Sequence, residues 1–373
     1  MGSIHDYNTA DGNRYLVRYK KPNGTHAARR GFRSPAEARA YLAFIDASIG
    51  RGRYVDPKHA LVPVGELATG WLEFQTAVLK PSSVHSLHSA WRMHVEPRWG
   101  DTIINDTTHS DVRHWVASLT TKHGASTVIR AHGVLAGILD VAVRDRRLTD
   151  NPARGIRLPR KTPTPHGYLT HAQVAQLARQ ARHPELVYLL AYTGLRWGEA
   201  TGLRVRDIDT SRRRLHVQEN AVTVNGTIHV GTPKTHRSRT VPYPEFYAPF
   251  IVTAIDGKRP CDLVFGDGRE HPRPPSSQSG WFAAAVKRTQ AQDTGFPRVT
   301  PHDLRHTAAA LAIRAGANVK VVQRMLGHAS ATMTLDTYAH LFEDDLDTVA
   351  GALHDAHTAA GALHDAHTAA GPS

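Results

Sequence analysis

A segment near the middle of the chain shows neither helical nor strand periodicity, and it divides the sequence. It runs NPARGIRLPRKTPTPHG from Asn151 to Gly167 and is rich in proline and in basic residues. Prolines lack the backbone N–H that a helix needs, and they hold such a segment semi-extended. A chain of 373 residues is also too long for one hydrophobic core. We therefore predict a multidomain protein and place the interdomain linker itself at residues 159–167.

Residues 1–57 have the pattern of a small β-sheet covered by one helix. Two alternating runs flank Pro22–Gly24 (Pro-Asn-Gly), which is a strong signal for a hairpin turn. Ser34 then supplies a helix cap, with proline at the first helical position and Glu37 at the third. The helical pattern continues to about Ile49. This is the first predicted domain.

The region 64–158 is helical in pattern throughout. Apolar residues recur there every three or four positions, which is typical of amphipathic helices around a shared core. In the first stretch we expect Leu67, Trp71, Phe74 and Val78 to form one apolar face. The region therefore predicts an all-α domain, with helical stretches at 66–78, 83–95, 108–119 and 125–144.

Residues 168–350 combine both periodicities and predict a mixed α+β domain in which helices predominate. Helical patterns open and close it, and strand-like alternation lies between them. The expected helices are 170–182, 184–193, 197–203 and several between 281 and 342, and the expected strands are 214–224, 227–230 and 239–241.

The last segment, residues 351–373, contains the decamer GALHDAHTAA twice, from Gly351 and from Gly361. Its histidines and aspartates invite a metal-binding interpretation. A recently duplicated, alanine-rich tail, partly helical or disordered, is the simpler interpretation. We therefore predict no metal site and no cofactor.

The charge of the chain favours a polyanionic partner. The formal net charge is +13, and the residues after 342 hold six acidic side chains and no Lys or Arg, which leaves +19 on residues 1–342. Such an excess on a folded body indicates nucleic acid, although a generically basic surface is the alternative. A single cysteine, Cys261, argues against a disulfide framework. Because there is no signal peptide and no run of about 20 apolar residues, we expect an intracellular protein without membrane contact.

Two polar clusters in the third domain involve arginine and lysine. Arg196 stands shortly after Gly194 at a helix start, where its guanidinium can hold a phosphate while Glu199 holds the arginine from behind. An ordinary helix-start arginine paired with Glu199 is the alternative. Lys234 lies at a predicted hairpin tip, where it could protonate a leaving oxygen or simply be solvated.

Two further clusters contain histidine. His302 and Arg305 share a face of a helix whose start is fixed by Pro301, close to the end that attracts anions. A capping role for His302 is the alternative. His328 precedes Tyr338 by ten residues, and this tyrosine could equally be an ordinary buried one.

Together these side chains suit transesterification at a phosphodiester without a metal. Arg and Lys stabilise charge on phosphoryl oxygens, His and Lys move protons, and tyrosine serves as a covalent nucleophile. Asp207 and Asp209 hint at a two-metal nuclease, but no further carboxylates stand at suitable places.

The same motifs resemble those of the tyrosine recombinases, the phage integrase family. Residues 64–158 are similar to the core-binding domain of this family, and residues 1–57 resemble the small arm-binding domain of phage and integrative-element integrases. The resemblance implies a site-specific recombinase that integrates or excises a mobile element. It rests on Arg196 in TGLR, Lys234 in PKT, His302 and Arg305 in PHDLRH, and His328 and Tyr338 in LGHASATMTLDTYAHL.

The resemblance also implies the roles of these residues. Tyr338 would attack a scissile phosphate and form a 3′-phosphotyrosyl link with a free 5′-hydroxyl, and neither ATP nor a metal would be needed. Arg196 and Arg305 would clamp the non-bridging oxygens. Lys234 would protonate the 5′-oxygen, His302 would assist proton transfer at the tyrosine, His328 would hydrogen-bond the phosphate, and Glu199 would orient Arg196.

The partner that the resemblance implies is double-stranded DNA with core-type and arm-type attachment sites. The chain would act on this DNA as a homotetramer, in the cytoplasm of a bacterial host. A DNA-bending host factor and an excisionase are possible further partners. A type IB topoisomerase-like strand transferase and a DNA-binding regulator without catalysis are the alternative functions. The N-terminal hairpin would read arm sites with Arg14, Arg18, Lys20, Lys21, Arg29 and Arg30, unless it is only a basic sheet.

Overall fold

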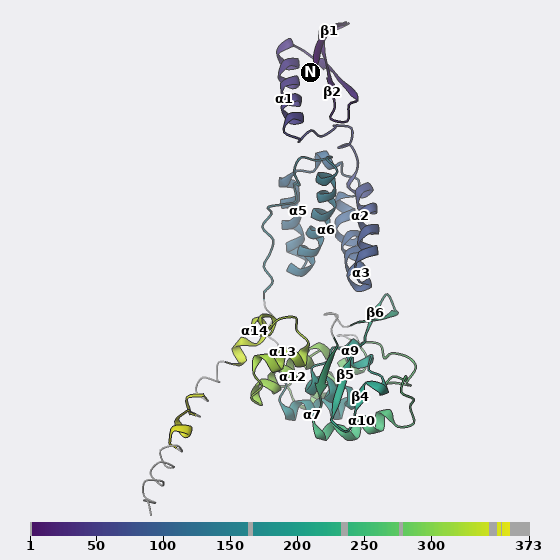
Figure 1. Ribbon diagram of the computed structural model, residues 1–373, viewed down its shortest axis with the longest axis vertical. Coiled ribbons are helices and arrows are strands. Elements are labelled where there is room, and N and C mark those ends of the chain that lie inside the picture. Colours follow the sequence, from purple (N-terminus) through teal and green to yellow (C-terminus); the bar gives the residue numbers. More distant parts are fainter. Residues whose placement is uncertain are drawn as a thin grey trace, which may run out of the picture. The chain divides into compact units, whose positions relative to one another are not determined.

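The computed structural model describes residues 2–162, 167–232, 238–275, 279–342, 349–351 and 353–358, which fall into two compact units (Figure 1). The first unit is residues 1–163 and the second is residues 164–373. The predicted fold class is confirmed at a coarse level: a small sheet with a helix comes first, then a helical region, then a mixed α+β region.

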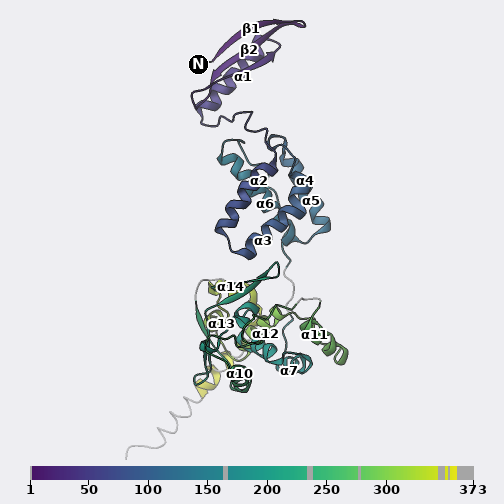
Figure 2. The same cartoon turned by 90° about the vertical axis from the view of Figure 1, so that its right-hand side faces the viewer.

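The N-terminal sheet has three antiparallel strands, β1 (Ser3–Thr9), β2 (Gly12–Lys20) and β3 (His26–Phe32), with β2 in the middle. Helix α1 (Pro35–Gly50) lies along one face (Figure 2), and Ser34 Oγ caps it by accepting the Glu37 N–H at 3.2 Å. The predicted hairpin and helix are thus confirmed. Strand β1 was not predicted, because only two of its seven residues are even partly buried and its hydrophobic alternation is weak.

Five helices and a short π-helical turn form the next region around one core. They are α2 (Val64–Val78), α3 (Pro81–Ala90), α4 (Glu96–Trp99), α5 (His109–Lys122) and α6 (Ala125–Arg144), with a π-helical turn at Trp91–Val95. Figure 1 shows α6 between α5 and the α2–α3 pair. Among the described residues, α6 is long and apolar enough to cross a membrane, but nine of its residues are buried, as in the core helix of a globular domain.

The predicted apolar face of α2 is only half correct. Leu67 is buried and Trp71 packs against the core, but Phe74 is 63% exposed and Val78 is 56% exposed. The buried stripe instead consists of Val64, Leu67, Ala68 and Leu72. Phe74 falls at the edge of this stripe, and Val78 lies in the last turn of the helix.

The first part of the proline-rich segment, residues 151–158, which we placed before the predicted linker at 159–167, packs with the helical region. Ala153 is fully buried, and its carbonyl lies 2.8 Å from His132 Nε2. Asn151 donates to the Ala136 carbonyl and to Asp140 Oδ1, at 2.8 and 2.7 Å. Residues 151–158 are therefore fastened to α6, which periodicity could not predict because their contacts are polar and irregular.

The second unit begins with three helices, α7 (His171–Gln180), α8 (Pro184–Thr193) and α9 (Trp197–Thr201). A small sheet follows, with the strand order β4 (Ile208–Asp209), β5 (Arg214–Val217), β8 (Arg239–Pro242). Strands β6 (Asn220–Val224) and β7 (Thr227–Gly231) form a separate hairpin. The single strand predicted at 214–224 is therefore two strands, and β4 was not predicted.

Helices complete the second unit. They are α10 (Ala248–Ile255), α11 (Trp281–Gln292), α12 (Pro301–Arg314), α13 (Val319–Leu326) and α14 (Ala331–Tyr338). Helix α10 was not predicted, because Pro249 reads as a helix breaker although it lies in the first turn, where its missing N–H costs nothing. In the tail, residues 353–358 are helical, and the second copy of the decamer lies outside the described residues.

Candidate active site

Arg196 lies where α9 begins, and Glu199 holds it in place. The Arg196 N–H donates to Glu199 Oε2 at 2.9 Å, and Arg196 Nη1 donates to Oε1 at 2.8 Å. The Glu199 side chain is fully buried, whereas the Arg196 side chain keeps 24% of its surface exposed. Arg196 is therefore anchored from the protein side and open on the other, an arrangement that fits both a phosphate-holding arginine and an ordinary helix-start arginine.

A second arginine, Arg239, also binds the Glu199 carboxylate, and this contact was not predicted. Arg239 on β8 donates to both Glu199 oxygens, at 2.7 and 3.1 Å, and its Nε donates to the Met325 carbonyl at 3.1 Å. Its side chain is only 11% exposed. In the sequence it is the second of two arginines that closely follow Lys234, and nothing local distinguishes it from the first.

Arg305 on α12 is almost completely buried, with 3% of its surface exposed. Its guanidinium donates to the Gly194 carbonyl at the end of α8, and to the Leu326 carbonyl at the end of α13 at 2.5 Å. The carboxyl end of a helix carries partial negative charge, so two helix ends jointly hold this cation. Both helices terminate at glycines in the left-handed conformation, Gly194 with φ 65° and Gly327 with φ 66°.

The charges of this cluster do not balance. Three guanidinium groups, those of Arg196, Arg239 and Arg305, surround the single carboxylate of Glu199. Burial would raise the pKa of Glu199, but the hydrogen bonds and charge of Arg239 and the charge of Arg196 lower it to about 2. Burial lowers the pKa of Arg305 to about 9, and Arg196 and Arg239 act in the same direction. The cluster thus favours a further anion.

His328 lies at the edge of this cluster, just after α13. Its Nδ1 is 3.0 Å from Thr334 Oγ1, and its carbonyl accepts from Gln323 Nε2 at 3.2 Å. Burial lowers the pKa of His328 to about 4, and the charges of Arg305, Arg196 and Arg239 act in the same direction. The imidazole is therefore neutral at pH 7 and can donate a hydrogen bond at one nitrogen and accept one at the other.

Tyr338, the last residue of α14, is 1% exposed, so burial, the ordinary expectation for a tyrosine, is met. However, its hydroxyl lies 2.7 Å from His306 Nδ1, a residue that we did not predict to take part. Burial raises the pKa of Tyr338 to about 12, while the charge of Arg305 opposes this shift. His302 lies on α12, as His306 does, and is exposed; the two rings are 5.2 Å apart.

The remaining predicted residues lie elsewhere. Lys234 falls within residues 233–237, outside the described residues. Four of the six basic residues predicted to bind DNA, Arg14, Arg18, Lys20 and Arg30, share the face of the N-terminal sheet opposite α1, where Arg30 lies over the Tyr7 ring at 5.9 Å. The other two are engaged differently: Arg29 lies over Tyr41 of α1 at 4.8 Å, and Lys21 forms an ion pair with Asp56.

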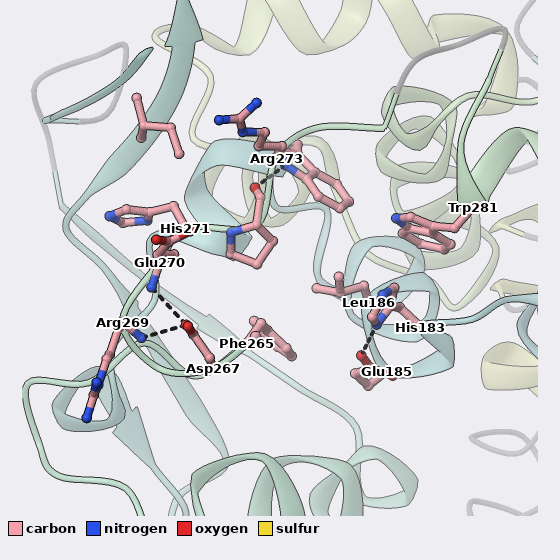
Figure 3. A pocket seen from close by; sticks show the side chains of 14 residues that line it. His183, Glu185, Leu186, Phe265, Asp267, Arg269, Glu270, His271, Arg273 and Trp281 are labelled. Carbon is pink, nitrogen blue, oxygen red and sulfur yellow. Dashed lines mark hydrogen bonds and ion pairs between the residues drawn. The ribbon is translucent and has the colours of Figure 1, made fainter. Parts of the chain in front are cut away.

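Figure 3 shows a pocket of about 630 Å³ in the second unit. Trp281, His183 and Arg273 border it, and its lining includes none of the candidate catalytic side chains. Its charged groups are partly satisfied among themselves, since His183 Nδ1 lies 3.2 Å from Glu185 Oε1. The chemistry that the arginine cluster offers is thus separate from the space that would enclose a small molecule.

The arginine cluster can bind an anion, stabilise charge that develops on it, and act beside a tyrosine in the same unit. Among the described residues, no group of three His, Cys, Asp or Glu side chains is placed to hold a metal ion. A phosphate diester is such an anion, and a tyrosine hydroxyl is a nucleophile that can attack it.

Comparisons with known proteins agree with this chemistry. Residues 168–344 match the phage integrase family. The integrase of Mycobacterium phage D29 is 28% identical over 325 residues, which is 82% of this chain and 84% of that protein. The Tn1549 transposon integrase in complex with a circular intermediate DNA has a TM-score of 0.67 at 22% identity and covers 78% of this chain and 99% of its own. A lambda integrase tetramer bound to a Holliday junction has a TM-score of 0.57 at 15% identity and covers 88% of this chain and 96% of its own.

Proposed function

Residues 168–344 form a domain of the phage integrase family, the tyrosine recombinases, and on this premise we propose that the chain is a site-specific recombinase that integrates or excises a mobile DNA element. One observation carries the proposal furthest. Two guanidinium groups, those of Arg196 and Arg239, bond to one buried carboxylate, and the charge of a third, Arg305, acts on both that carboxylate and a buried tyrosine of the same unit. Such a site is short of one anion, and the scissile phosphate supplies it.

In the proposed reaction Tyr338 attacks the phosphorus, forms a 3′-phosphotyrosyl link and releases a 5′-hydroxyl. Arg196 and Arg305 stabilise the charge on the non-bridging oxygens, and removal of one such donor typically slows a reaction by about 10²- to 10³-fold. Lys234 protonates the leaving 5′-oxygen, and His328 hydrogen-bonds the phosphate. Because the link keeps the energy of the phosphodiester, the 5′-hydroxyl of another strand can reverse the step without ATP.

His302 was predicted to assist proton transfer at the tyrosine. Its position supports only an indirect role, because its ring contacts His306, and His306 in turn contacts Tyr338. Glu199 has the stronger support for its role, since both oxygens of its carboxylate are bonded to the arginines that it orients.

We further propose the division of labour among the domains. Residues 64–158 and the catalytic domain, residues 168–350, close around core-type DNA from opposite sides, with the linker at 159–167 joining them. Residues 1–57 bind arm-type DNA, and residues 351–373 are a tail. Two duplexes and four strand cuts require four copies, so the active species is a tetramer on DNA.

The experiment that tests the proposal uses nicked DNA that carries the attachment site of the element. The wild-type chain should form a covalent adduct on it, and Tyr338→Phe should form none; the absence of an adduct with the wild type would overturn the proposal. Two-plasmid recombination separates the recombinase from a topoisomerase, which would relax a supercoiled plasmid without exchanging partners. A regulator without catalysis would bind the site and form no adduct.

The cytoplasm of the bacterial host is the compartment in which this DNA is found.

A further inference from the structure

The hydrogen bond between His306 and Tyr338 joins two helices of the second unit. His306 lies on α12 directly after Arg305, and Tyr338 ends α14. The bond from Nδ1 to the phenol oxygen is 2.7 Å long, and the two rings are 5.7 Å apart and tilted by 56°. Successive residues of a helix point about 100° apart. Arg305 can therefore reach the ends of α8 and α13 while its neighbour reaches Tyr338.

His306 is placed better than His302 to act on the nucleophile. His302 is exposed, and its ring contacts the His306 ring edge-on at 5.2 Å. The two histidines stand four residues apart on one face of α12, with His306 on the inner side. Together they form a path from the buried phenol toward solvent.

The buried phenol needs a proton acceptor. Burial raises the pKa of Tyr338 to about 12, so phenolate is scarce at neutral pH. A neighbouring base that takes the proton while the new bond forms removes the need for free phenolate, and such assistance typically contributes about 10²- to 10⁴-fold in rate. A neutral imidazole within hydrogen-bond distance is a suitable acceptor.

Resting on the proposed function, we propose that His306 is a catalytic residue that accepts the Tyr338 proton during cleavage and returns it during rejoining. In cleavage, the phenol oxygen forms a bond to phosphorus, its proton passes to His306 Nδ1, and the bond from phosphorus to the 5′-oxygen breaks. That oxygen takes a proton from the general acid assigned to Lys234. In rejoining, the attacking 5′-hydroxyl gives its proton to the lysine, and the protonated His306 returns its own proton to the tyrosine.

The first test replaces His306 by asparagine, whose side chain keeps a hydrogen-bonding group near the position of Nδ1 but cannot accept a proton. We expect His306→Asn to form the adduct on nicked site DNA about 100-fold more slowly, with the affinity for that DNA unchanged. His171→Asn is the matched control, because His171 Nδ1 makes a bond of the same length, 2.7 Å, to the Tyr192 hydroxyl in the same unit. The control should form the adduct at the wild-type rate.

The second test lowers the pKa of the nucleophile itself. Fluorotyrosine at position 338 ionises more readily, so it should restore most of the rate that His306→Asn loses while changing the wild-type rate little. A wild-type rate in His306→Asn would overturn the inference, and so would a loss that fluorotyrosine does not restore, because either result leaves His306 with a structural role only. If His306→Asn does not fold, His306→Gln takes its place in both tests.

These outcomes are distinct from a failure of the proposed function. If the wild-type chain forms no adduct, the recombinase proposal itself falls. If the wild type forms the adduct and only the behaviour of the His306 variants differs from expectation, the recombinase proposal stands and the proton acceptor is another group.

Discussion

Glu199 is the residue on which the arrangement of the site depends most. Its two oxygens accept hydrogen bonds from Arg196 and Arg239 and from the Arg196 backbone N–H. Arg239 in turn bonds to the Met325 carbonyl, next to the carbonyl that holds Arg305. One carboxylate therefore links the start of α9, strand β8 and the end of α13.

Removing this charge should destabilise the second unit strongly. Breaking a buried ion pair by removing one partner costs about 3–5 kcal/mol, because the remaining charges are left uncompensated. We expect Glu199→Gln to lower the free energy of unfolding by this amount in urea denaturation and to abolish adduct formation. Glu219→Gln is the matched control, since Glu219 also bonds two arginines, Arg204 and Arg206, but keeps 24% of its side chain exposed. Equal losses in the two variants would contradict the central role of Glu199.

His328 should make the stability of the protein depend on pH. Its pKa is lowered from the ordinary value of 6.5 to about 4 by burial and by the charges of Arg305, Arg196 and Arg239. Between pH 6.5 and pH 4 the unfolded chain gains a proton at this residue and the folded chain does not, so stability falls as the pH falls through this range. We expect the urea midpoint of the wild type to drop more between about pH 7 and about pH 4.5 than that of His328→Gln. Parallel curves for the two proteins would refute this prediction.

At this scale, sequence patterns could predict residues that stand in distinctive local motifs but not those defined by distant partners. Arg196, Arg305, His328 and Tyr338 each stand in such a motif, and the structure brings the first three together. Arg239 acquires its place from Glu199, 40 residues away, and His306 acquires its place from Tyr338, 32 residues away. No local signal separates Arg239 from an ordinary arginine, and although His306 ends the motif PHDLRH, nothing in that motif indicates its contact with Tyr338.

At the scale of secondary structure, the ends of helices contribute more to the site than their middle turns do. The carbonyls that hold Arg305 belong to the ends of α8 and α13, and Arg196 caps the start of α9. Gly327, which ends α13 with a φ of 66°, is packed so tightly that an added Cβ would lie 2.9 Å from Arg239 Nη1.

Substitution of this glycine should therefore affect function as well as stability. Gly327→Ala places a side chain in the left-handed conformation, which costs about 1–2 kcal/mol, and it also pushes Arg239 away from Glu199. Gly257→Ala is the matched control, because Gly257 has the same φ of 66° with nothing within 4 Å of the added Cβ. We expect both variants to lose stability in thermal denaturation and only Gly327→Ala to lose adduct formation. Loss of activity in the control would show that backbone strain alone is responsible.

The elements that periodicity predicted are those with one clearly buried face, whether or not a side chain caps them. Helix α6 occupies the predicted range, Ala125–Arg144, and α1 begins at its predicted cap. The missed elements, β1, β4 and α10, are short or half-exposed. The strand predicted at 214–224 is divided just before Asn220, where Glu219 pairs with Arg204. Such features depend on tertiary contacts that a local pattern does not contain.

At the scale of the whole molecule, the start of the second unit is tied to the segment that follows Tyr338. Tyr168, the first residue after the predicted linker, has its hydroxyl 3.2 Å from His340 Nε2, two residues beyond Tyr338. The next residue, Leu169, donates its N–H to Thr307 Oγ1 on α12 at 3.2 Å. The first residues of the second unit are therefore bonded to α12 and to the turn that follows α14.

The division into DNA-binding domains can be tested on the full chain. The N-terminal sheet carries Arg14 and Arg18 on the face that α1 leaves open, where they can contact DNA phosphates or bases. The double variant Arg14→Gln, Arg18→Gln should bind arm-type DNA more weakly. Its affinity should also depend less steeply on salt, by about 0.9 in the log–log slope for each phosphate that the protein no longer neutralises. Adduct formation on core-type DNA should be unchanged.

The control for this prediction must remove the same charge from the same domain. Arg51 and Arg53 are exposed and follow α1 outside the sheet, so Arg51→Gln, Arg53→Gln alters the net charge equally without touching the open face. If both double variants weaken arm binding alike, the domain acts only as a diffuse positive charge, because attraction at a distance depends on net charge rather than on position. If only the sheet variant does so, the open face of the sheet makes the contact. If the sheet variant also slows the adduct on core-type DNA, the N-terminal domain contributes to core binding, and the separation of arm and core functions between residues 1–57 and the rest of the chain is wrong.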